Sequence, residues 1–179
     1  MITEIEILKY INAHRIVEAD TILIFLSASA YLISAALMFA VAVYGFVRMQ
    51  QDFVRLFVFV FCSLAISTTT VCILKYGIGR VRPYVEDDTI VLLTTASSPS
   101  FPSGHTTTTM VIYFALANYI NIPRKYRLLV LLWAVLVAYS RLALGAHYPS
   151  DVIIGILIAF LSVIAAKRLL EKFNSYEFA

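Results

Sequence analysis

Two long uncharged runs in the first half of the chain constrain its fold more than any other feature. Ile22–Val47 is a run of 26 residues without a charged side chain, and Leu56–Leu74 is a similar run of 19 residues. A helix needs about 20 predominantly apolar residues to cross the hydrocarbon core of a bilayer. Helices in the core of a soluble domain are rarely so long and so free of charge. Both runs therefore predict membrane-spanning helices.

Three further apolar stretches follow, and charged residues interrupt or flank them. They are Thr106–Ile122, Leu128–Ala146 with Arg141 near its end, and Val152–Ala166, which Lys167 and Arg168 follow. Basic side chains at a helix end can extend to the lipid headgroups. Across the chain 61% of the residues are hydrophobic, whereas about half of a soluble domain is apolar. We expect an all-α integral membrane protein with about five transmembrane helices in one domain, residues 1–179.

Apolar residues also recur at helical spacing ahead of the first long run. Ile2, Ile5, Leu8, Ile11 and Ile16, with the polar residues between them, predict a short amphipathic helix at the membrane interface. His14 lies in this segment without a predicted partner, so we assign it no function. The apolar run that follows is longer than the hydrophobic region of a signal peptide, so we expect it to be retained as the first span.

The basic residues between and after the predicted spans indicate an orientation. They gather in three segments: Arg48 and Arg55; Arg124, Lys125 and Arg127; and Lys167, Arg168 and Lys172. By the positive-inside rule these segments and the C-terminus are cytoplasmic. The loop from Lys75 to His105 and the turn at His147 then face the extracytoplasmic or periplasmic side of the cell (inner) membrane.

Composition argues against several other classes of protein. The net charge of +3 is dispersed over the loops and forms no basic stripe that would bind a nucleic acid. Cys62 and Cys72 both fall in the second apolar run, without the spacing of a redox or metal motif. We expect no metal, no cofactor and no nucleic-acid partner, and packing roles for both thiols.

Three polar clusters lie at the ends of predicted spans: Lys75–Pro83, Pro102–His105 and Ser140–Asp151. Lys75 or Arg141 alone would be expected to extend to the headgroups, because a charge at membrane depth is costly. Both are instead predicted on one face, together with Arg82 and two of the three histidines. Three cations in one place repel one another unless a multivalent anion such as a phosphate neutralises them.

The local sequence around the second cluster favours anion binding. Ser103 precedes a predicted helix and is suited to its N-cap, which leaves the N–H groups of Gly104 and His105 at the positive end of the helix. In the first cluster, Pro83 ends any helix and favours an extended Arg82. We therefore expect the backbone to turn there and to direct both Lys75 and Arg82 inward.

The third cluster pairs a histidine with a carboxylate. Pro149 favours the first position of a helix, so His147 lies just before the last span and Asp151 in its first turn. From there the carboxylate can reach back to the imidazole, fix its tautomer and stabilise its charged form. Asp151 would also complement the helix dipole.

The three clusters together resemble the signature of the type 2 phosphatidic acid phosphatase (PAP2) superfamily, written KxxxxxxRP, PSGH and SRxxxxxHxxxD. Every signature position is filled, and the resemblance covers residues 75–151. It implies that His147 attacks phosphorus to form a phosphohistidine, and that His105 protonates the leaving oxygen and later activates water. Asp151 would orient His147. The resemblance also implies that five groups hold the phosphate without a metal: Lys75, Arg82, Ser103, the Gly104 amide and Arg141.

This resemblance predicts a phosphatase acting on a lipid phosphate monoester or diphosphate. Phosphatidic acid, phosphatidylglycerol phosphate, undecaprenyl diphosphate and a lipid A phosphate all fit equally. A lipid phosphotransferase on the same scaffold and a membrane protein that binds headgroups without catalysis are the two alternatives. Arg80 and the acidic run Glu86–Asp88 lie outside the signature, and we expect them to face solvent or headgroups.

Overall fold

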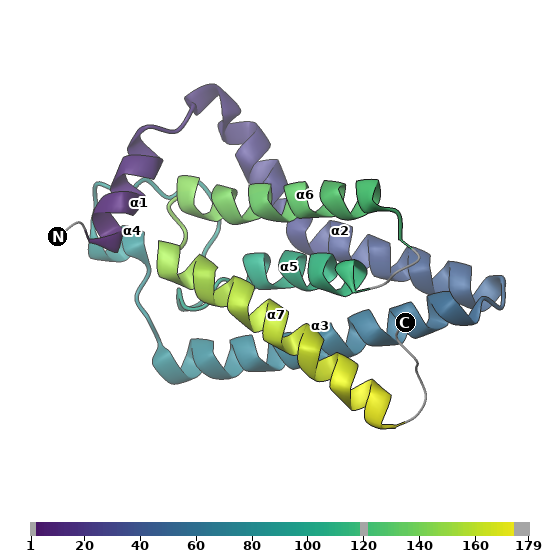
Figure 1. Ribbon diagram of the computed structural model, residues 1–179. Coiled ribbons are helices and arrows are strands. Elements are labelled where there is room, and N and C mark those ends of the chain that lie inside the picture. Colours follow the sequence, from purple (N-terminus) through teal and green to yellow (C-terminus); the bar gives the residue numbers. More distant parts are fainter. Residues whose placement is uncertain (1–2, 119–121, 174–179) are drawn as a thin grey trace.

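The two long uncharged runs form two long helices that lie side by side. In the computed structural model, which describes residues 3–118 and 122–173, α2 spans Asp20–Val47 and α3 spans Gln51–Ile78 (Figure 1). A tight turn joins them, in which the Gln50 amide donates to the Gly45 carbonyl over 2.9 Å. Gly45 permits the close approach, because a Cβ there would lie 3.0 Å from the Val54 nitrogen. The predicted spans are thus confirmed as one antiparallel pair.

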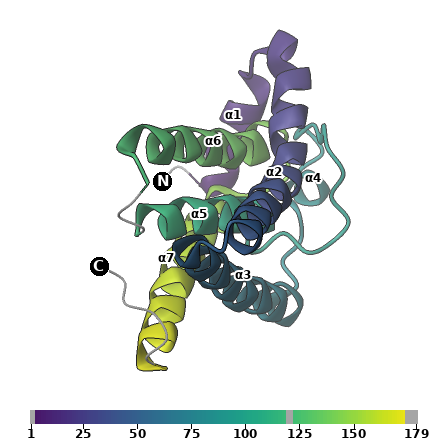
Figure 2. The same ribbon diagram turned by 90° about the vertical axis from the view of Figure 1, so that its right-hand side faces the viewer.

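The second half of the chain adds three helices: α5 (Gly104–Ala117), α6 (Arg124–Ala143) and α7 (Pro149–Lys172). Figure 2 shows α5 surrounded by α2, α3, α6 and α7, and α5 packs against each of them. Phe59 of α3, Val111 of α5 and Val163 of α7 are among the residues of the shared core, and each is at most 1% exposed. This packing places α5 at the centre of the bundle.

The five predicted spans correspond to five helices, α2, α3, α5, α6 and α7, but α5 is shorter than a membrane-spanning helix. Within the described residues, four segments are long and apolar enough to cross a membrane: Val17–Val47, Gln51–Glu86, Arg124–Ala143 and Pro149–Lys172. Helix α5 has only 14 residues. Because its neighbours enclose it, it does not need a continuous apolar surface, and Thr106, Thr107 and Thr109 are buried in it. The predicted end of this span falls partly on residues 119–121, outside the described ranges.

The amphipathic segment at the start forms α1 (Glu4–Ala13), as predicted. A capping box between Thr3 and Glu6 begins the helix. Leu8 is fully buried, and Asn12 donates to the Val91 and Ala143 carbonyls over 3.0 and 2.8 Å. The helix is therefore docked on the bundle. His14 is exposed, as expected.

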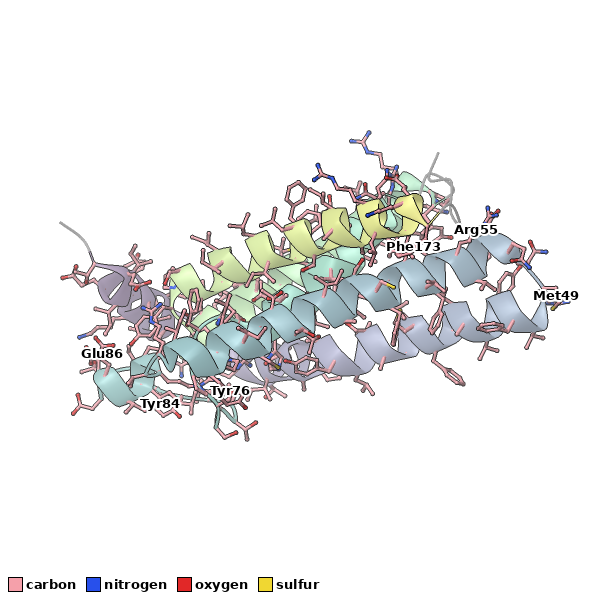
Figure 3. The ribbon with its side chains drawn as sticks, turned by 90° about the horizontal axis from the view of Figure 1, so that it is seen from below. Met49, Arg55, Tyr76, Tyr84, Glu86 and Phe173 are labelled. Atoms are coloured by element: carbon pink, nitrogen blue, oxygen red, sulfur yellow. The ribbon has the colours of Figure 1, made fainter. Side chains whose placement is uncertain are left out.

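The bundle has two distinct ends. The α2–α3 turn, the start of α6 and the end of α7 lie at one end, while α1 and the short α4 (Pro83–Glu86) lie at the other (Figure 1). Figure 3 shows Met49, Arg55 and Phe173 at the first end and Tyr76, Tyr84 and Glu86 at the second. All three basic segments therefore meet at one end, and the three signature clusters meet at the opposite end.

Candidate active site

A cavity of about 330 Å³ opens at the end of the bundle that carries α1. Six of the eight predicted site residues line it: Lys75, Arg82, Gly104, His105, Arg141 and His147. They come from α3, the segment before α4, α5, α6 and the link between α6 and α7. The cavity therefore gathers three cationic side chains and two histidines from segments that are far apart in the sequence.

The remaining two predicted residues lie behind this wall. Ser103 and Asp151 are both fully buried, and the Ser103 amide donates to the Asp151 carbonyl over 3.1 Å. Ser103 is the N-cap residue of α5, as predicted, but its hydroxyl pairs with the Thr106 hydroxyl at 3.0 Å and caps no helix N–H. This backbone contact joins the start of α5 to the start of α7.

The backbone turns between Lys75 and Arg82, as predicted. Helix α3 ends at Ile78, and Gly79 follows with a φ of 64°, which glycine adopts without strain. Arg82 is extended, with φ −79° and ψ 149°. Pro83 departs from the expectation that it ends a helix, because it begins α4, where its fixed φ suits the first helical position.

Two of the cations hold the loop that covers the cavity. Lys75 Nζ donates to the Pro99 carbonyl over 2.6 Å, and Arg82 Nε donates to the Ser98 carbonyl over 2.7 Å. Arg82 Nη1 also donates to the Ala146 carbonyl over 2.7 Å, next to His147. These bonds fix the segment just before the second signature cluster, and both side chains line the cavity.

The third cation has donor capacity to spare. Arg141 is 1% exposed, and its Nη1 donates to Ser27 Oγ. Its Nε is buried and has no partner among the residues that the structure describes. A buried donor without a partner costs about 1–3 kcal/mol. Arg141 also lines the cavity, so its side chain combines an unpaired donor with a place in the cavity wall.

The two ring nitrogens of His147 face different partners, Asp151 on one side and Arg82 on the other. It is 2% exposed, and Nδ1 lies 3.3 Å from Asp151 Oδ2. An ionised carboxylate only accepts, so Nδ1 carries the proton and Nε2 keeps its lone pair. Nε2 lies 3.5 Å from Arg82 Nη1. Burial lowers the pKa of His147 to about 4, although the Asp151 hydrogen bond opposes the shift, so the ring is neutral at pH 7.

Asp151 is fixed by the turn that begins α7. Pro149 is the first residue of that helix, and the Tyr148 amide donates to Asp151 Oδ2 over 3.0 Å. The Ser100 hydroxyl donates to the same oxygen over 2.5 Å. The predicted geometry of histidine before the helix and aspartate in its first turn is thus present. The roles assigned to both residues remain predictions.

Arg80 contradicts the expectation that it faces solvent or headgroups. Its Nη1 donates to Asp151 Oδ1 over 2.9 Å, its Nη2 pairs with Glu4 of α1, and its guanidinium lies 3.8 Å from the centre of the Tyr148 ring. The extended backbone after Gly79 directs it toward α7 and not outward. No pattern in the sequence places Glu4 beside Arg80, because 76 positions separate them.

The acidic run is also more involved than predicted. Glu86 accepts a hydrogen bond from the Tyr148 hydroxyl, and Asp87 pairs with Lys9 of α1 at 2.9 Å. Hydrogen bonds from Thr89 and Lys9 lower the pKa of Asp87 to about 2. The run therefore anchors α1 and the Tyr148 turn.

Two cavity residues had no signal in the sequence. Tyr31 of α2 packs against His105, with ring centroids 4.5 Å apart. Cys72 of α3, expected only to pack, lies in the cavity wall.

Within the described ranges no group of three His, Cys, Asp or Glu residues could hold a metal ion.

A second, more open cavity of about 630 Å³ adjoins the first. His105 and Thr95 line both. The walls of the second come from one face of α2 and from the loop before Ser97, and they include Ile24, Ala28 and Leu93. This second cavity, whose lining is part apolar and part polar, lies directly beside one of the two site histidines.

Comparisons with known proteins agree with this fold and signature. The chain is 37% identical over 103 residues to a lipid A 1-phosphatase of Rhizobium etli, which covers 55% of this chain and 43% of that protein. It is 30% identical over 169 residues to an undecaprenyl-diphosphatase of Sulfolobus acidocaldarius, covering 89% and 76% respectively. The crystal structure of Aquifex aeolicus LpxE superposes with a TM-score of 0.75 at 25% identity, covering 94% of this chain and 99% of that one.

The matches cover different shares of the lengths of these relatives. The chain spans less than half the length of the lipid A 1-phosphatases that it matches. The family model described as the PAP2 superfamily matches residues 56–175, a segment that contains all three signature clusters. The chain is an integral membrane protein and belongs to the PAP2 superfamily.

Proposed function

We propose that the chain is a membrane-embedded phosphatase that hydrolyses a lipid phosphate monoester or diphosphate through a phosphohistidine on His147. One observation carries the proposal. His147 Nδ1 lies against Asp151, Nε2 lies 3.5 Å from Arg82 Nη1, and the residue lines a cavity together with Lys75, Arg82 and Arg141. A neutral nucleophile beside three cations is suited to attack a bound phosphate dianion.

In the first half of the reaction, His147 Nε2 attacks the phosphorus. The new N–P bond forms as the P–O bond to the lipid breaks, and His105, which the negative charge of the bound phosphate keeps protonated, gives its proton to the leaving oxygen and becomes neutral. The three cations and the Gly104 amide stabilise the charge on the non-bridging oxygens. Asp151 stabilises the imidazole, which becomes positively charged as it is phosphorylated.

In the second half, water attacks the phosphohistidine. His105, now neutral, takes a proton from that water, and the N–P bond breaks so that its electron pair returns to Nε2. Inorganic phosphate leaves, and both histidines regain their starting states. No metal is required, because the cationic side chains supply the positive charge at the phosphate.

The lipid nature of the substrate rests on the surroundings of the site. The cavity lies where apolar helices end, which is the depth of a headgroup, and the second cavity beside it offers Ile24, Ala28 and Leu93 to the chain of a lipid leaving group. Relatives named as a lipid A 1-phosphatase and an undecaprenyl-diphosphatase support this class. Phosphatidic acid and phosphatidylglycerol phosphate belong to the same class and are included in the proposal.

The site faces the extracytoplasmic side in this proposal. All three basic segments lie at the opposite end of the bundle, and such segments are retained in the cytoplasm. An impermeant thiol reagent tests this orientation. With cysteine at Asp88 in a chain lacking Cys62 and Cys72, intact cells are expected to be labelled, whereas cysteine at Met49 is expected to need permeabilised cells.

Phosphate release from purified protein in detergent tests the function itself. We expect release from the four lipids of this class in excess EDTA, inhibition by vanadate, and loss of activity in His147→Ala. The matched control is His14→Ala, since His14 is an exposed histidine outside the site. Full activity in His147→Ala would refute the mechanism. Measuring transfer to an added lipid alcohol alongside phosphate release separates a hydrolase from a transferase.

A further inference from the structure

Arg80 lies outside the family signature, yet it contacts the carboxylate behind the proposed nucleophile. Asp151 Oδ2 faces His147, the Ser100 hydroxyl and the Tyr148 amide, whereas Oδ1 accepts only from Arg80 Nη1, at 2.9 Å, among the interactions described. Asp151 is fully buried. A positive charge beside a buried carboxylate favours its ionised form, in addition to the hydrogen bonds that it accepts. Arg80 supplies that charge.

The position of the Arg80 guanidinium is fixed from several sides. It lies over the Tyr148 ring, with 3.8 Å between Cζ and the ring centroid, and Nη1 also donates to Ser150 Oγ over 2.7 Å. The backbone carbonyl of Arg80 accepts a hydrogen bond from the Ser100 amide over 2.8 Å. Tyr148 is 1% exposed and follows His147 directly. Arg80 is therefore built into the same turn that carries the nucleophile.

Glu4 of α1 binds the other side of this guanidinium. Glu4 pairs with Arg80 Nη2 and also accepts from the Ser150 hydroxyl. Burial raises the pKa of Glu4, but the hydrogen bonds from Ser150 and Arg80 outweigh burial and hold the pKa below its usual range. Glu4 is therefore ionised at neutral pH. Together Glu4, Arg80 and Asp151 carry one positive and two negative charges, a net charge of −1.

This net charge matches what the reaction needs. Arg80 alone would cancel the charge of Asp151 and weaken its support of a cationic imidazole. With Glu4 bound to Arg80, the group of three keeps one negative charge for the imidazolium that forms during phosphorylation. The Glu4 contribution comes from a helix that lies outside residues 56–175, the segment matched by the family model.

Resting on the proposed function, we infer that Arg80 is a positioning residue for Asp151, and that Glu4 balances its charge so that α1 takes part in catalysis. A purely structural role, in which these residues only dock α1, is the competing explanation. Lys9 offers a matched control, because its 2.9 Å ion pair with Asp87 also fixes α1 but touches neither Asp151 nor His147.

The test compares Arg80→Gln, Arg80→Lys, Glu4→Gln and Lys9→Met in the full chain. We expect Arg80→Gln to lower kcat on the order of 10- to 100-fold with little change in KM, as for the loss of a charge-assisted hydrogen bond. Arg80→Lys restores part of the rate, since lysine keeps the charge without the planar fork. Glu4→Gln lowers kcat less, and Lys9→Met leaves it unchanged.

The titration of His147, followed by 15N NMR of histidine-labelled protein, gives a readout that docking alone would not move. The other charged or titratable groups near the ring are Arg82, Arg141 and His105, and none of them is replaced in these variants. Removing the Arg80 cation raises the pKa of His147, and removing the Glu4 anion lowers it. Lys9→Met leaves the pKa unchanged.

Opposite shifts in Arg80→Gln and Glu4→Gln would establish the electrostatic role. Shifts of the same sign, or activity losses that follow Tm equally in Glu4→Gln and Lys9→Met, would overturn it. If the unmodified protein releases no phosphate from any lipid, the proposed function fails, while the titration still decides the charge arrangement. An active protein whose His147 titration ignores both variants sinks this inference alone.

Discussion

Tyr31 and His105 lie ring against ring, with centroids 4.5 Å apart and planes inclined by 53°, although they belong to α2 and α5. The Tyr31 hydroxyl also lies 2.9 Å from the position that a Cβ on Gly104 would occupy. Tyr31 therefore borders both the proposed acid and the start of α5. The first span thus contributes to a site whose signature lies wholly in the later ones.

Replacing Tyr31 tests this contact. Tyr31→Ala is expected to lower kcat about 2- to 10-fold, since an aromatic pair contributes about 0.5–1.5 kcal/mol beyond its buried area. Tyr31→Phe keeps the ring and is expected to retain nearly full activity. Steady-state phosphate release measures both. Equal losses in the two variants would show that the hydroxyl, and not the ring contact, matters.

Cys72 provides a reporter of anion binding, because it is exposed and lines the cavity. In Cys62→Ser, vanadate is expected to slow the reaction of Cys72 with a maleimide at least several-fold, because an anion bound in the cavity restricts access to the thiol. In the control Cys72→Ser, labelling of Cys62 should not respond to vanadate, since Cys62 packs against the core. An unprotected Cys72 would argue against anion binding in this cavity.

The second cavity beside His105 predicts a difference between lipid and water-soluble substrates. Ala28→Trp places a large side chain in this second cavity. We expect it to lower kcat/KM for long-chain lipid phosphates about tenfold or more and to leave the hydrolysis of p-nitrophenyl phosphate unchanged. The estimate corresponds to losing burial of two or more CH2 groups at about 0.8 kcal/mol each. Ala36→Trp is the control, because Ala36 is exposed on the same helix and lines neither cavity. Equal losses on both substrates would place the lipid elsewhere.

Gly145 supports the turn that carries His147, so its replacement is expected to destabilise the protein. It has a φ of 70°, and a Cβ there would lie 2.7 Å from the Val91 carbonyl oxygen. Gly145→Ala should lower the free energy of unfolding by about 1–3 kcal/mol, the cost of a non-glycine residue in a strained backbone conformation. Gly77→Ala is the control, because no atom lies within 4 Å of its Cβ position in α3. Thermal unfolding in detergent compares them, and a stable Gly145→Ala would contradict the contact with Val91.

The buried His147 predicts that the stability of the folded protein falls at acidic pH. Burial lowers its pKa to about 4, against about 6.5 for a free histidine. The neutral ring therefore contributes stability that is fully present above about pH 6.5 and is lost as the pH falls through about 4. 15N NMR of the three histidines, assigned with His14→Gln and His105→Gln, follows the ring directly. Titration at or above pH 6.5 would be incompatible with a buried neutral nucleophile.

The sequence by itself determined the membrane class, the helices and the candidate chemistry. Uncharged runs specify spans because lipid excludes unpaired polar groups, and Pro149 marks the start of a helix through its own backbone preference. Both effects act within a few residues of the chain. The order of His147, Pro149 and Asp151 was therefore sufficient to predict a carboxylate that reaches back to the imidazole.

Only the tertiary structure decided which distant residues support that site. Glu4 reaches Arg80 across 76 positions, and Tyr31 reaches His105 from another helix. Such contacts depend on how the helices pack, which no local preference specifies. The same packing explains the short α5, whose threonines are buried by four neighbouring helices and so need no apolar surface of their own. Arg80 looked like a headgroup-facing cation because its partners, Glu4 and Asp151, become its neighbours only after folding.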